Sequence, residues 1–527
     1  MNEPFVSKIS MGSAKFLDAV RKSVQDPVEQ KALLDLIPQN SNTVTIDLLA
    51  LVPEVLQALL DQQLSMNQRR AISIFVCGGD RSKILETSLA SAKDVHNAIN
   101  GLSTKEDIPN AEIMINGRWY PILLYSELVT SNWVGSSETY AMLTANAKIC
   151  DVSETYRWQV GSDHFEDENG KPIEMTISHL LERLGIRPIV GDLKEYMKRL
   201  RASQKLASEV GRQINITNSV LICHNFSWWK KTEPINLGSP TSPRKCIVEG
   251  ELEVGNNANY YANRGCKTVD WPFVRVFSLD LKKYVYADID DTEEYHYDSG
   301  SIDRLVLPDD VHSLLKDVFT SEALLFGDVV RGKHGGMVIL ANGPTGVGKT
   351  LTAEVFAEYT RRPLYVMEMG ELGISLADVE QNLQRIFLRA ARWNTVLLFD
   401  EADIFMAKRD DNLERSAIVG VFLRLLDYYH GLLFLTSNRA EVIDPAFKSR
   451  ITLSLTYPEL SREARLKIWV TMFQLAKITI TDGLDGIPDV VLNGRQIRNM
   501  VRLLKVLHPD GKIGSGEVKR VCEFSCK

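Results

Sequence analysis

The chain has 527 residues, a formal net charge of −7 and a hydrophobic fraction of 44%. This length predicts about three domains, and the composition is that of a globular protein, which excludes a wholly disordered chain. The negative net charge argues against a surface that binds polyanions throughout, although it leaves room for a local basic patch.

Cysteine usage and apolar runs bound the class of protein further. The seven cysteines are scattered, and none forms a C-x-x-C pair, which argues against a disulfide framework and a structural zinc site. No apolar run reaches the length of about 18 residues that a membrane-spanning helix needs, and the first residues lack the pattern of a signal peptide. We therefore expect a cytoplasmic protein without a membrane span.

The first part of the chain mixes helical and strand-like patterns. Apolar side chains recur at helical spacing in residues 16–20 and 52–60, whereas residues 119–125 are typical of a strand. Residues 1–300 contain neither H-E-x-x-H nor G-x-S-x-G nor a clustered set of His and Asp, so protease or nuclease chemistry is not indicated there. We predict that residues 1–235 form a mixed α/β region that recognises a partner.

One segment of this region is a basic, amphipathic helix pattern over residues 193–212. Its basic residues are Lys194, Lys198, Arg199, Arg201, Lys205 and Arg212. A positive helix face could bind nucleic acid or an acidic partner, but a solvated face explains the same pattern. Both interpretations stay open at this point.

A loop-like stretch and a hairpin pattern come next. Residues 234–243 are punctuated by Pro, Gly and Ser, which predicts an exposed loop or linker. Residues 272–278 and 283–288 alternate in the manner of a β-hairpin. We predict a β-rich linker region over residues 236–300.

From about residue 301 the pattern changes to alternating strands and helices. Apolar strand patterns occupy residues 337–341, 363–368, 395–399 and 432–436. Runs this apolar are typical of a parallel sheet covered by helices on both faces. Beyond Leu460 the pattern becomes helical.

The first of these strands leads into a glycine-rich loop, Gly343-Pro-Thr-Gly-Val-Gly-Lys-Thr350, which fits G-x-x-x-x-G-K-[ST]. A strand, a glycine turn and a helix N-terminus together form an anion cradle, because backbone N–H groups and the helix dipole point at one spot. Lys349 can reach the phosphates, and the Thr350 hydroxyl can hold Mg²⁺. The predicted nucleotide-binding residues here are Gly343, Pro344, Thr345, Gly346, Val347, Gly348, Lys349, Thr350 and Leu351.

Two acidic residues end the strand at residues 395–399. Asp400 and Glu401 follow it directly, and the carboxyl end of a strand in an open parallel sheet lies near such a phosphate loop. Asp400 is predicted to orient Mg²⁺, together with Thr350, and Glu401 to polarise the attacking water.

Three further residues complete the predicted site. Asn438 ends the strand at residues 432–436, and its amide can hold the attacking water or the γ-phosphate if that strand lies between the other two. Arg450 lies too far along the chain to serve its own phosphate loop easily, so it is the candidate arginine finger offered to a neighbouring subunit. Arg495, at the start of a later helix, is a candidate cation for the γ-phosphate; Arg498 and Arg502 compete with it.

The set Gly343–Thr350, Leu397–Asp403, Thr436–Arg439 and Asp444–Arg450, in this order and spacing, resembles an AAA+ ATPase module. The resemblance implies a P-loop NTPase αβα sandwich over residues 301–458, a small helical lid over 459–527, and ATP with Mg²⁺ bound between subunits of a hexameric ring. It also implies family roles: Walker A for Lys349 and Thr350, Walker B for Asp400 and Glu401, sensor 1 for Asn438, the finger for Arg450 and sensor 2 for Arg495.

Two departures from the family pattern qualify this expectation. The finger region carries only Lys448 beside Arg450, where many relatives have two arginines. The loop Met369–Ser375 lacks the aromatic–apolar–Gly motif of relatives that thread polypeptides, and it offers only Leu372 and Ile374 as apolar substitutes. Threading through a central pore is therefore not predicted.

The sequence favours a ring-forming ATPase that couples hydrolysis of Mg-ATP to remodelling or assembly of a protein partner selected by the N-terminal region. One alternative is an ATPase that acts on nucleic acid, like clamp loaders or helicase loaders. Another is an ATP-dependent oligomerisation switch in signalling or defence.

Overall fold

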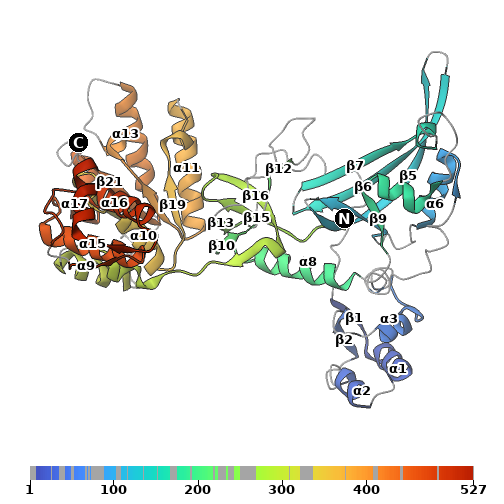
Figure 1. Cartoon of the computed structure of the whole chain (residues 1–527). Helices are drawn as coiled ribbons and strands as arrows, with labels where there is room; N and C mark the ends of the chain where they lie inside the picture. Colours follow the sequence, from blue (N-terminus) through green and yellow to red (C-terminus); the bar gives the residue numbers. More distant parts are fainter. Residues whose placement is uncertain are drawn as a thin grey trace. The chain divides into compact units, whose positions relative to one another are not determined.

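The chain forms two compact units: Met1–Val210 with Ile214–Glu293, and Gly211–Gln213 with Glu294–Lys527 (Figure 1). The computed structural model describes residues 8–24, 27–34, 42–48, 51, 53–65, 68, 72, 88–102, 109–115, 117–133, 136–150, 152–165, 175–189, 193–217, 220–222, 233–235, 243–249, 269–307, 309–320, 336–373, 375–406, 413–438, 443–483 and 486–525.

The first unit begins with a small helical layer on a two-stranded sheet. Strands β1 (Lys8–Gly12) and β2 (Thr43–Asp47) pair antiparallel, and the helices are α1 (Ser13–Ser23), α2 (Pro27–Leu34) and α3 (Pro53–Leu60). Helix α1 buries Phe16, Ala19 and Val20, which share one helix face. The helices predicted over residues 16–20 and 52–60 are confirmed.

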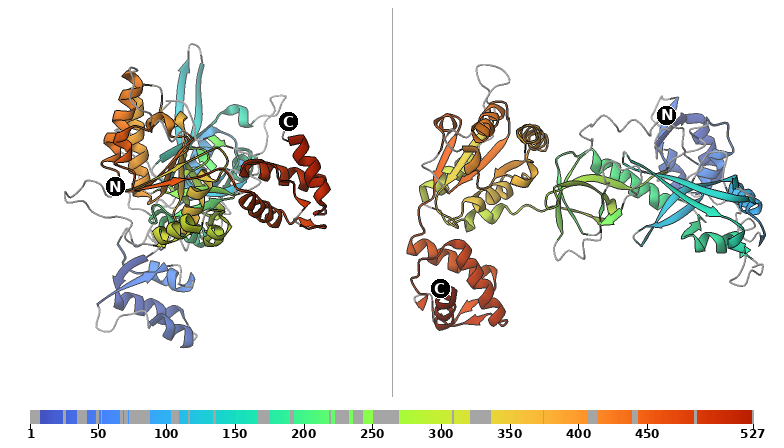
Figure 2. Two further views of the ribbon diagram at one scale, coloured as in Figure 1. Left: turned by 90° about the vertical axis from the view of Figure 1, so that its left-hand side faces the viewer. Right: turned by 90° about the horizontal axis from the view of Figure 1, so that it is seen from above.

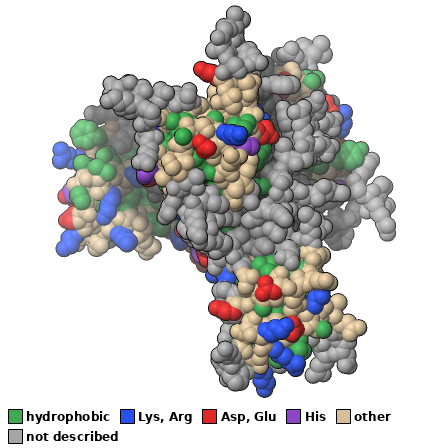
Figure 3. All heavy atoms as spheres, turned by 90° about the vertical axis from the view of Figure 1, so that its right-hand side faces the viewer, with side chains coloured by type: hydrophobic (Ala, Val, Ile, Leu, Met, Phe, Trp, Pro, Cys, Tyr) green, Lys and Arg blue, Asp and Glu red, His purple; other side chains and the backbone are tan. Residues whose placement is uncertain are grey.

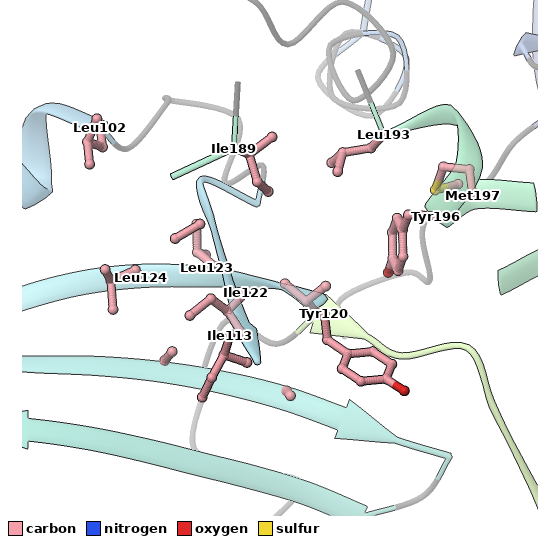
Figure 4. Close-up of a cluster of buried hydrophobic side chains, with 14 of the residues drawn as sticks. Leu102, Ile113, Tyr120, Ile122, Leu123, Leu124, Ile189, Leu193, Tyr196 and Met197 are labelled. Carbon is pink, nitrogen blue, oxygen red and sulfur yellow. The ribbon is translucent and has the colours of Figure 1, made fainter. Parts of the chain in front are cut away.

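The next layer is a six-stranded sheet with the order β14-β6-β5-β4-β9, in which β7 also pairs with β6. Buried side chains from β4, from β5 and from the residue before α8 belong to one hydrophobic cluster, among them Ile113, Ile122 and Leu193 (Figure 4). The strand predicted over residues 119–125 lies within β5. The bounds of the elements here are β3 (Ser88–Leu89), α6 (Ala92–Leu102), β4 (Ala111–Ile115), β5 (Arg118–Trp133), β6 (Ser136–Ile149), β7 (Val152–Val160), β8 (Met175–Thr176), α7 (Ile177–Arg183), β9 (Ile186–Pro188), α8 (Lys194–Ala207) and β14 (Val269–Asp270).

A seven-stranded sheet completes this part of the chain, with the order β12-β11-β16-β15-β13-β10-β17. Its strands are β10 (Gln213–Ile216), β11 (Val220–Ile222), β12 (Glu233–Ile235), β13 (Arg244–Val248), β15 (Phe273–Ser278), β16 (Lys283–Asp288) and β17 (Thr292–Glu294). β15 and β16 pair antiparallel as a hairpin, which confirms the hairpin prediction. The sheet takes strands from both sides of the domain boundary predicted at residue 235, and the two compact units divide at residue 293 rather than at 300.

A buried charge network joins the two larger sheets of the first unit. Asp288 at the end of β16 accepts hydrogen bonds from Arg199 Nη2 (2.7 and 2.9 Å) and from the Tyr120 hydroxyl. Arg118 donates to both oxygens of Asp291 (2.7 and 2.9 Å). Burial, with the neighbouring Asp288 carboxylate, raises the pKa of Tyr120, so its hydroxyl stays a donor. The network fixes β5 and α8 against the end of β16.

The same network bears on the basic helix of the sequence analysis. Arg199 of α8 is mostly buried and pairs with Asp288 and Asp290, and Lys198 pairs with Glu195. Both acidic and basic side chains are visible on the face shown in Figure 3. At least one arginine of the predicted positive face therefore serves the core and not a ligand.

The second unit is built on a five-stranded sheet with the order β19-β20-β21-β18-β22, parallel throughout. Its strands are β18 (Met337–Asn342), β19 (Leu364–Met367), β20 (Val396–Phe399), β21 (Leu432–Ser437) and β22 (Leu453–Thr456). Every residue of β20 and β21 is buried, as expected when helices cover both faces of a parallel sheet. The four strands predicted from apolar runs are confirmed.

Helices lie on both faces of this sheet (Figure 2). On one face, Phe356 of α10 packs against Phe434 of β21, with ring centroids 5.3 Å apart. On the other, Phe399 of β20 packs against Phe387 of α11 and Phe422 of α13. The helices are α9 (Asp309–Thr320), α10 (Lys349–Tyr359), α11 (Leu376–Arg392), α12 (Asp403–Met406), α13 (Leu413–Leu426) and α14 (Pro445–Lys448). The arrangement is the α/β fold of a P-loop NTPase.

The remaining residues form a small helical subdomain with its own core. Its elements are α15 (Arg462–Leu475), β23 (Thr479–Ile480), α16 (Gly494–Leu507), β24 (Lys512–Ile513) and α17 (Ser515–Ser525). Trp469, Ile497, Leu504 and Val518 are among its buried residues. Throughout the described ranges of the whole chain, no helix combines the length and apolarity needed to cross a membrane.

We predict that Asp288→Ala destabilises the first unit by about 3 kcal/mol, because it leaves the buried Arg199 guanidinium without its main partner. Urea unfolding followed by tryptophan fluorescence measures the change. Lys198→Ala is the matched control on the same helix, since that pair is exposed, and it should leave the midpoint unchanged. Equal effects of the two substitutions would contradict the structural role given to Asp288.

Candidate nucleotide-binding site

The loop between β18 and α10 is shaped by its glycines. Gly343, Gly346 and Gly348 have φ values of 146°, 77° and 110°, which side-chain-bearing residues rarely adopt. A Cβ on Gly343 would lie 2.3 Å from the Tyr457 carbonyl oxygen, and one on Gly346 would lie 2.6 Å from Cγ of Asn493. A Cβ on Gly348 would meet no atom within 4 Å. The first two glycines are therefore required by close packing, and all three by backbone conformation.

Tyr457, which follows β22, contacts residues on both sides of this loop. Its N–H donates to the Asn342 carbonyl at 2.8 Å, and its buried hydroxyl donates to Thr352 Oγ1 of α10 at 2.7 Å. Burial raises the pKa of Tyr457 to about 12, which keeps the hydroxyl protonated. One residue, through its backbone N–H and its side chain, thus connects the strand before the loop to the helix after it.

Lys349 begins α10 and directs its ammonium group into the loop. Its Nζ donates to Gly343 O at 2.8 Å, Pro344 O at 2.6 Å and Asn438 Oδ1 at 2.8 Å, which uses all three of its N–H donors. Burial lowers the pKa of Lys349, and nearby acidic groups, with Asp400 first, oppose this effect. The three oxygens hold the ammonium where phosphate oxygens would otherwise be its partners.

The carboxylate that ends β20 is bound to the helix that follows the loop. Asp400 Oδ1 accepts a hydrogen bond from Thr350 Oγ1 at 3.0 Å and another from Thr436 Oγ1 at 2.5 Å. A hydroxyl and a carboxylate in contact form the kind of hard oxygen donor set that suits Mg²⁺. Both residues predicted to hold the metal are therefore together.

Glu401 has an unusual backbone. Its φ is 56°, in the left-handed region, and its N–H donates to Thr436 Oγ1 at 2.8 Å. Non-glycine residues in this region are often found where function maintains the strain. The side chain of Glu401 is exposed, so it is available to a bound water.

Asn438 lies where the sequence analysis required. Strand β21 lies between β18 and β20, so its carboxyl end lies between the phosphate loop and Asp400. Asp403 supports this end, because its Oδ1 accepts from Ser437 Oγ at 2.5 Å. Asp403 and Thr436 are positioning residues to which the sequence analysis gave no role. Their closeness in sequence to Glu401 and Asn438 could have indicated one.

The helical subdomain reaches the phosphate loop through Asn493 and Gly494. Gly494 N–H donates to the Gly346 carbonyl at 2.8 Å, and Asn493 caps α16 in a capping box with Gln496. Arg495 follows directly, is exposed, and lies close enough to Lys349 to lower that residue's pKa further. Asn493 was not singled out from the sequence, although Asn-x-x-Gln at a helix start was visible.

Arg450 stands apart from the residues above. Its Nε and Nη2 donate to the two oxygens of Asp427 at 2.7 and 3.0 Å, and its Nη1 donates to the Ala446 carbonyl at 2.8 Å. The hydrogen bond to Asp427 raises the pKa of Arg450. The structure therefore connects Arg450 to the turn after α13 rather than to Lys349, Asp400 or Asn438 among the described contacts.

The loop between β19 and α11 bears on polypeptide threading. Leu372, one of the two apolar substitutes named from the sequence, is only 1% exposed, and its carbonyl accepts from Asn382 Nδ2 at 3.1 Å. The other, Ile374, lies outside the described residues. Leu372 is thus a core residue of this loop and does not replace a pore aromatic.

Comparison with known proteins agrees with this geometry. The family described as "ATPase family associated with various cellular activities (AAA)" matches residues 339–459. An uncharacterized AAA family ATPase y4kL of Sinorhizobium fredii is 33% identical over 114 residues, which cover 20% of this chain and 34% of the relative. The ribosome biogenesis ATPase RIX7 of Saccharomyces cerevisiae is 31% identical over 144 residues, covering 25% and 17% respectively. Fidgetin-like protein 1 of Drosophila melanogaster is 30% identical over 140 residues, covering 25% and 27%.

We predict that Gly343→Ala abolishes nucleotide binding, because the added methyl group would overlap the Tyr457 carbonyl and distort the loop. Titration with a fluorescent ATP analogue measures the loss. Gly370→Ala is the control: it meets no atom within 4 Å and needs no left-handed backbone. Unchanged binding in Gly343→Ala would show that the loop tolerates a shift there.

Proposed function

This chain belongs to the AAA ATPases through residues 339–459, and on that premise we propose a ring-forming ATPase. It couples Mg-ATP hydrolysis to remodelling or assembly of a protein partner, which the first unit selects. The observation that carries the proposal is the direct hydrogen bonding of Lys349 to Asn438 and of Thr350 to Asp400. These two contacts bring the phosphate-binding loop, the acidic strand end and the central amide into one site.

Binding relies on the loop and its lysine. The N–H groups of the glycine loop and the N-terminus of α10 would receive the phosphates, and the Lys349 ammonium would exchange its bonds to Gly343, Pro344 and Asn438 for phosphate oxygens. Thr350 and Asp400 would hold Mg²⁺, which when bound neutralises charge on the phosphates. Arg495, beside Lys349, would add a second positive charge from the helical subdomain.

Hydrolysis assigns different tasks to two side chains. The exposed Glu401 carboxylate polarises the attacking water, and Asn438 orients that water or the γ-phosphate once Lys349 releases its amide oxygen. The Thr436 hydroxyl donates to Asp400 and accepts from the N–H of Glu401, and these two hydrogen bonds set the distance between the metal-binding and water-polarising groups. Positioning and charge stabilisation, rather than a covalent step, account for the reaction.

In a ring, a neighbouring subunit would add the positive charge of its Arg450 to the site. Arg450 is half-buried and is oriented by Asp427, so its guanidinium is preorganised rather than mobile. In a ring it would face the nucleotide of a neighbouring subunit and stabilise transition-state charge in trans. In the single chain, Asp427 holds the Arg450 guanidinium. When a neighbouring subunit docks, Arg450 would exchange part of its hydrogen bonding to Asp427 for contacts with the neighbour's nucleotide.

The class of partner is inferred from the first unit rather than from the nucleotide site. The matches cover between 17% and 34% of the three relatives above, so the partner is proposed from this chain's own first unit. A protein partner is favoured over nucleic acid because Arg199, at the centre of the basic helix, is paired with the buried Asp288. Stimulation of turnover by DNA or RNA would instead support a loader-type ATPase.

We predict that Glu401→Gln leaves ATP binding intact and lowers turnover by about a thousandfold, since it removes the water-polarising carboxylate and keeps the backbone contact to Thr436. Steady-state phosphate release and ATP-analogue titration separate the two effects. Glu371→Gln serves as a control elsewhere in the same subdomain. Normal turnover in Glu401→Gln would remove this residue from the mechanism.

We predict that turnover per subunit rises with protein concentration and falls by about a thousandfold in Arg450→Ala, while ATP binding persists. Phosphate release across a concentration series, with sizing in ATP, measures both. Asp427→Asn is the matched variant: it weakens the pair but retains the guanidinium, so it should keep most of the turnover. A concentration-independent rate untouched by Arg450→Ala would reduce the proposal to a nucleotide switch.

A further inference from the structure

Strand β5 has an edge that its neighbours cover only in part. Strand β4 pairs with β5 from Arg118 to Ile122. On the opposite side, β6 pairs with β5 without interruption from Leu123↔Asn146 to Trp133↔Ser136. The part of β5 after Ile122 therefore has a strand on one side and no described strand on the other.

Two asparagine side chains take the place of a strand at the start of this edge. The Asn110 carboxamide accepts from Leu124 N at 2.7 Å and donates to Leu124 O at 2.8 Å. Two residues further on, Asn100 of α6 does the same with Ser126, at 3.2 Å in each direction. These contacts show that the N–H and C=O groups of even-numbered residues point to the open side.

The pattern then stops while the strand continues. Because the β5–β6 register is unbroken, the N–H and C=O groups of Leu128, Thr130 and Asn132 point to the same side as those of Leu124 and Ser126. Within the described part of the chain, no strand or side chain forms a hydrogen bond with these groups on that side. We call the backbone of Leu128, Thr130 and Asn132 the open edge.

The open edge lies on a ribbon that runs beyond its sheet. Strand β7 pairs with β6 only as far as Val160↔Ala141, and from there β5 and β6 continue as a two-stranded ribbon (Figure 1). Leu128 is 40% exposed, and Thr130 is exposed as well. An isolated two-stranded ribbon is only marginally stable in water, so a further strand would stabilise it.

The sequence of the ribbon does not protect this edge. Natural edge strands are usually blocked by charged side chains, especially lysine, by proline or by a bulge, but residues 128–132 are Leu-Val-Thr-Ser-Asn, with none of these. The carboxamides of Asn100 and Asn110 protect the edge only at Leu124 and Ser126. Among the described residues, the edge of β5 is covered at Leu124 and Ser126 and uncovered beyond them, so an added strand could pair only with the uncovered part.

We propose that the open edge binds an extended segment of a partner protein as an added β-strand, in line with β4. Main-chain hydrogen bonds to Leu128, Thr130 and Asn132 would supply affinity, and side chains beside them would supply selectivity. An extended chain is the partner whose own N–H and C=O groups repeat at the spacing of this edge.

Charge indicates which segment would bind. Residues 127–140 of β5, β6 and their connection include two charged side chains, Glu127 and Glu138, and both are exposed. A second copy of the ribbon would place like charges together, whereas a segment with lysine or arginine among β-branched residues would complement them. The occupant is therefore a basic, extended segment of another protein.

This inference deepens the proposed function, because it gives the first unit the means of selecting its protein partner. It does not depend on the chemistry at Lys349 or Glu401. Binding at the open edge and ATP turnover are measured separately, so failure of one leaves the other standing.

The test is a selection from a displayed library of random peptides on the full-length chain, with Thr130→Pro as the counter-target. Proline removes the outward N–H at a position where an edge strand tolerates it, and Thr130→Ala is the matched control that retains it. Selected peptides should alternate basic and β-branched residues, bind Thr130→Pro at least about tenfold more weakly, and bind Thr130→Ala as they bind the wild type. Basal ATP turnover should be equal in all three chains.

Hydrogen exchange gives a second readout that needs no variant. A selected peptide should slow exchange of the Leu128 and Thr130 amides in the wild-type chain, since those amides become donors to the added strand. Peptides that bind both chains equally, or that leave these amides unprotected, would overturn the proposal. So would a wild-type dimer that Thr130→Pro dissociates, because the occupant would then be a second copy.

Discussion

The parallel alignment of β18, β21 and β20 is the constraint on which the chemistry of this protein depends. Because three parallel strands end at one edge, the glycine loop, Asn438 and Asp400 meet without any long-range loop to bring them together. Thr436 then fixes their spacing, since its hydroxyl contacts both the carboxylate of Asp400 and the N–H of Glu401. A buried residue of β21 thus links the metal-binding and water-polarising positions.

In the first unit, a charge network also brings side chains together at the end of a sheet. Asp288 collects Arg199 and Tyr120 at the end of one sheet, and Arg118 reaches both Asp288 and Asp291. Buried charges are costly unless each has a partner, so these contacts favour the observed arrangement of helix α8 and strand β5. Through Arg118 and Tyr120 the network also holds the start of β5, from which the β5–β6 ribbon extends.

The sequence predicted the ATPase module far better than the first unit, for physical reasons. Apolar runs such as residues 432–436 and the loop 343–350 carry their structure locally, because helix, strand and glycine signals lie within a few residues. The roles of Asp427 and Asn493 depend on contacts between residues far apart in the chain, which no local pattern encodes. Likewise, Arg199 reads as part of a basic helix face, and only the fold shows that it is a buried partner of Asp288. The strand order was needed before Asn438 could be placed.

The position of Tyr457 has a mechanical consequence. Its N–H holds Asn342, its hydroxyl holds Thr352, and its carbonyl lies against Gly343, so the chain is immobilised against the loop up to this residue. The segment Pro458–Ser461 connects this fixed residue to α15, and Leu460 within it packs against the core beside the parallel sheet. At the start of α16, the Gly494 N–H donates to the Gly346 carbonyl of the loop. The helical subdomain is thus attached beside the nucleotide site at two places, and any change in its angle to the sheet has to alter the contacts at one of them.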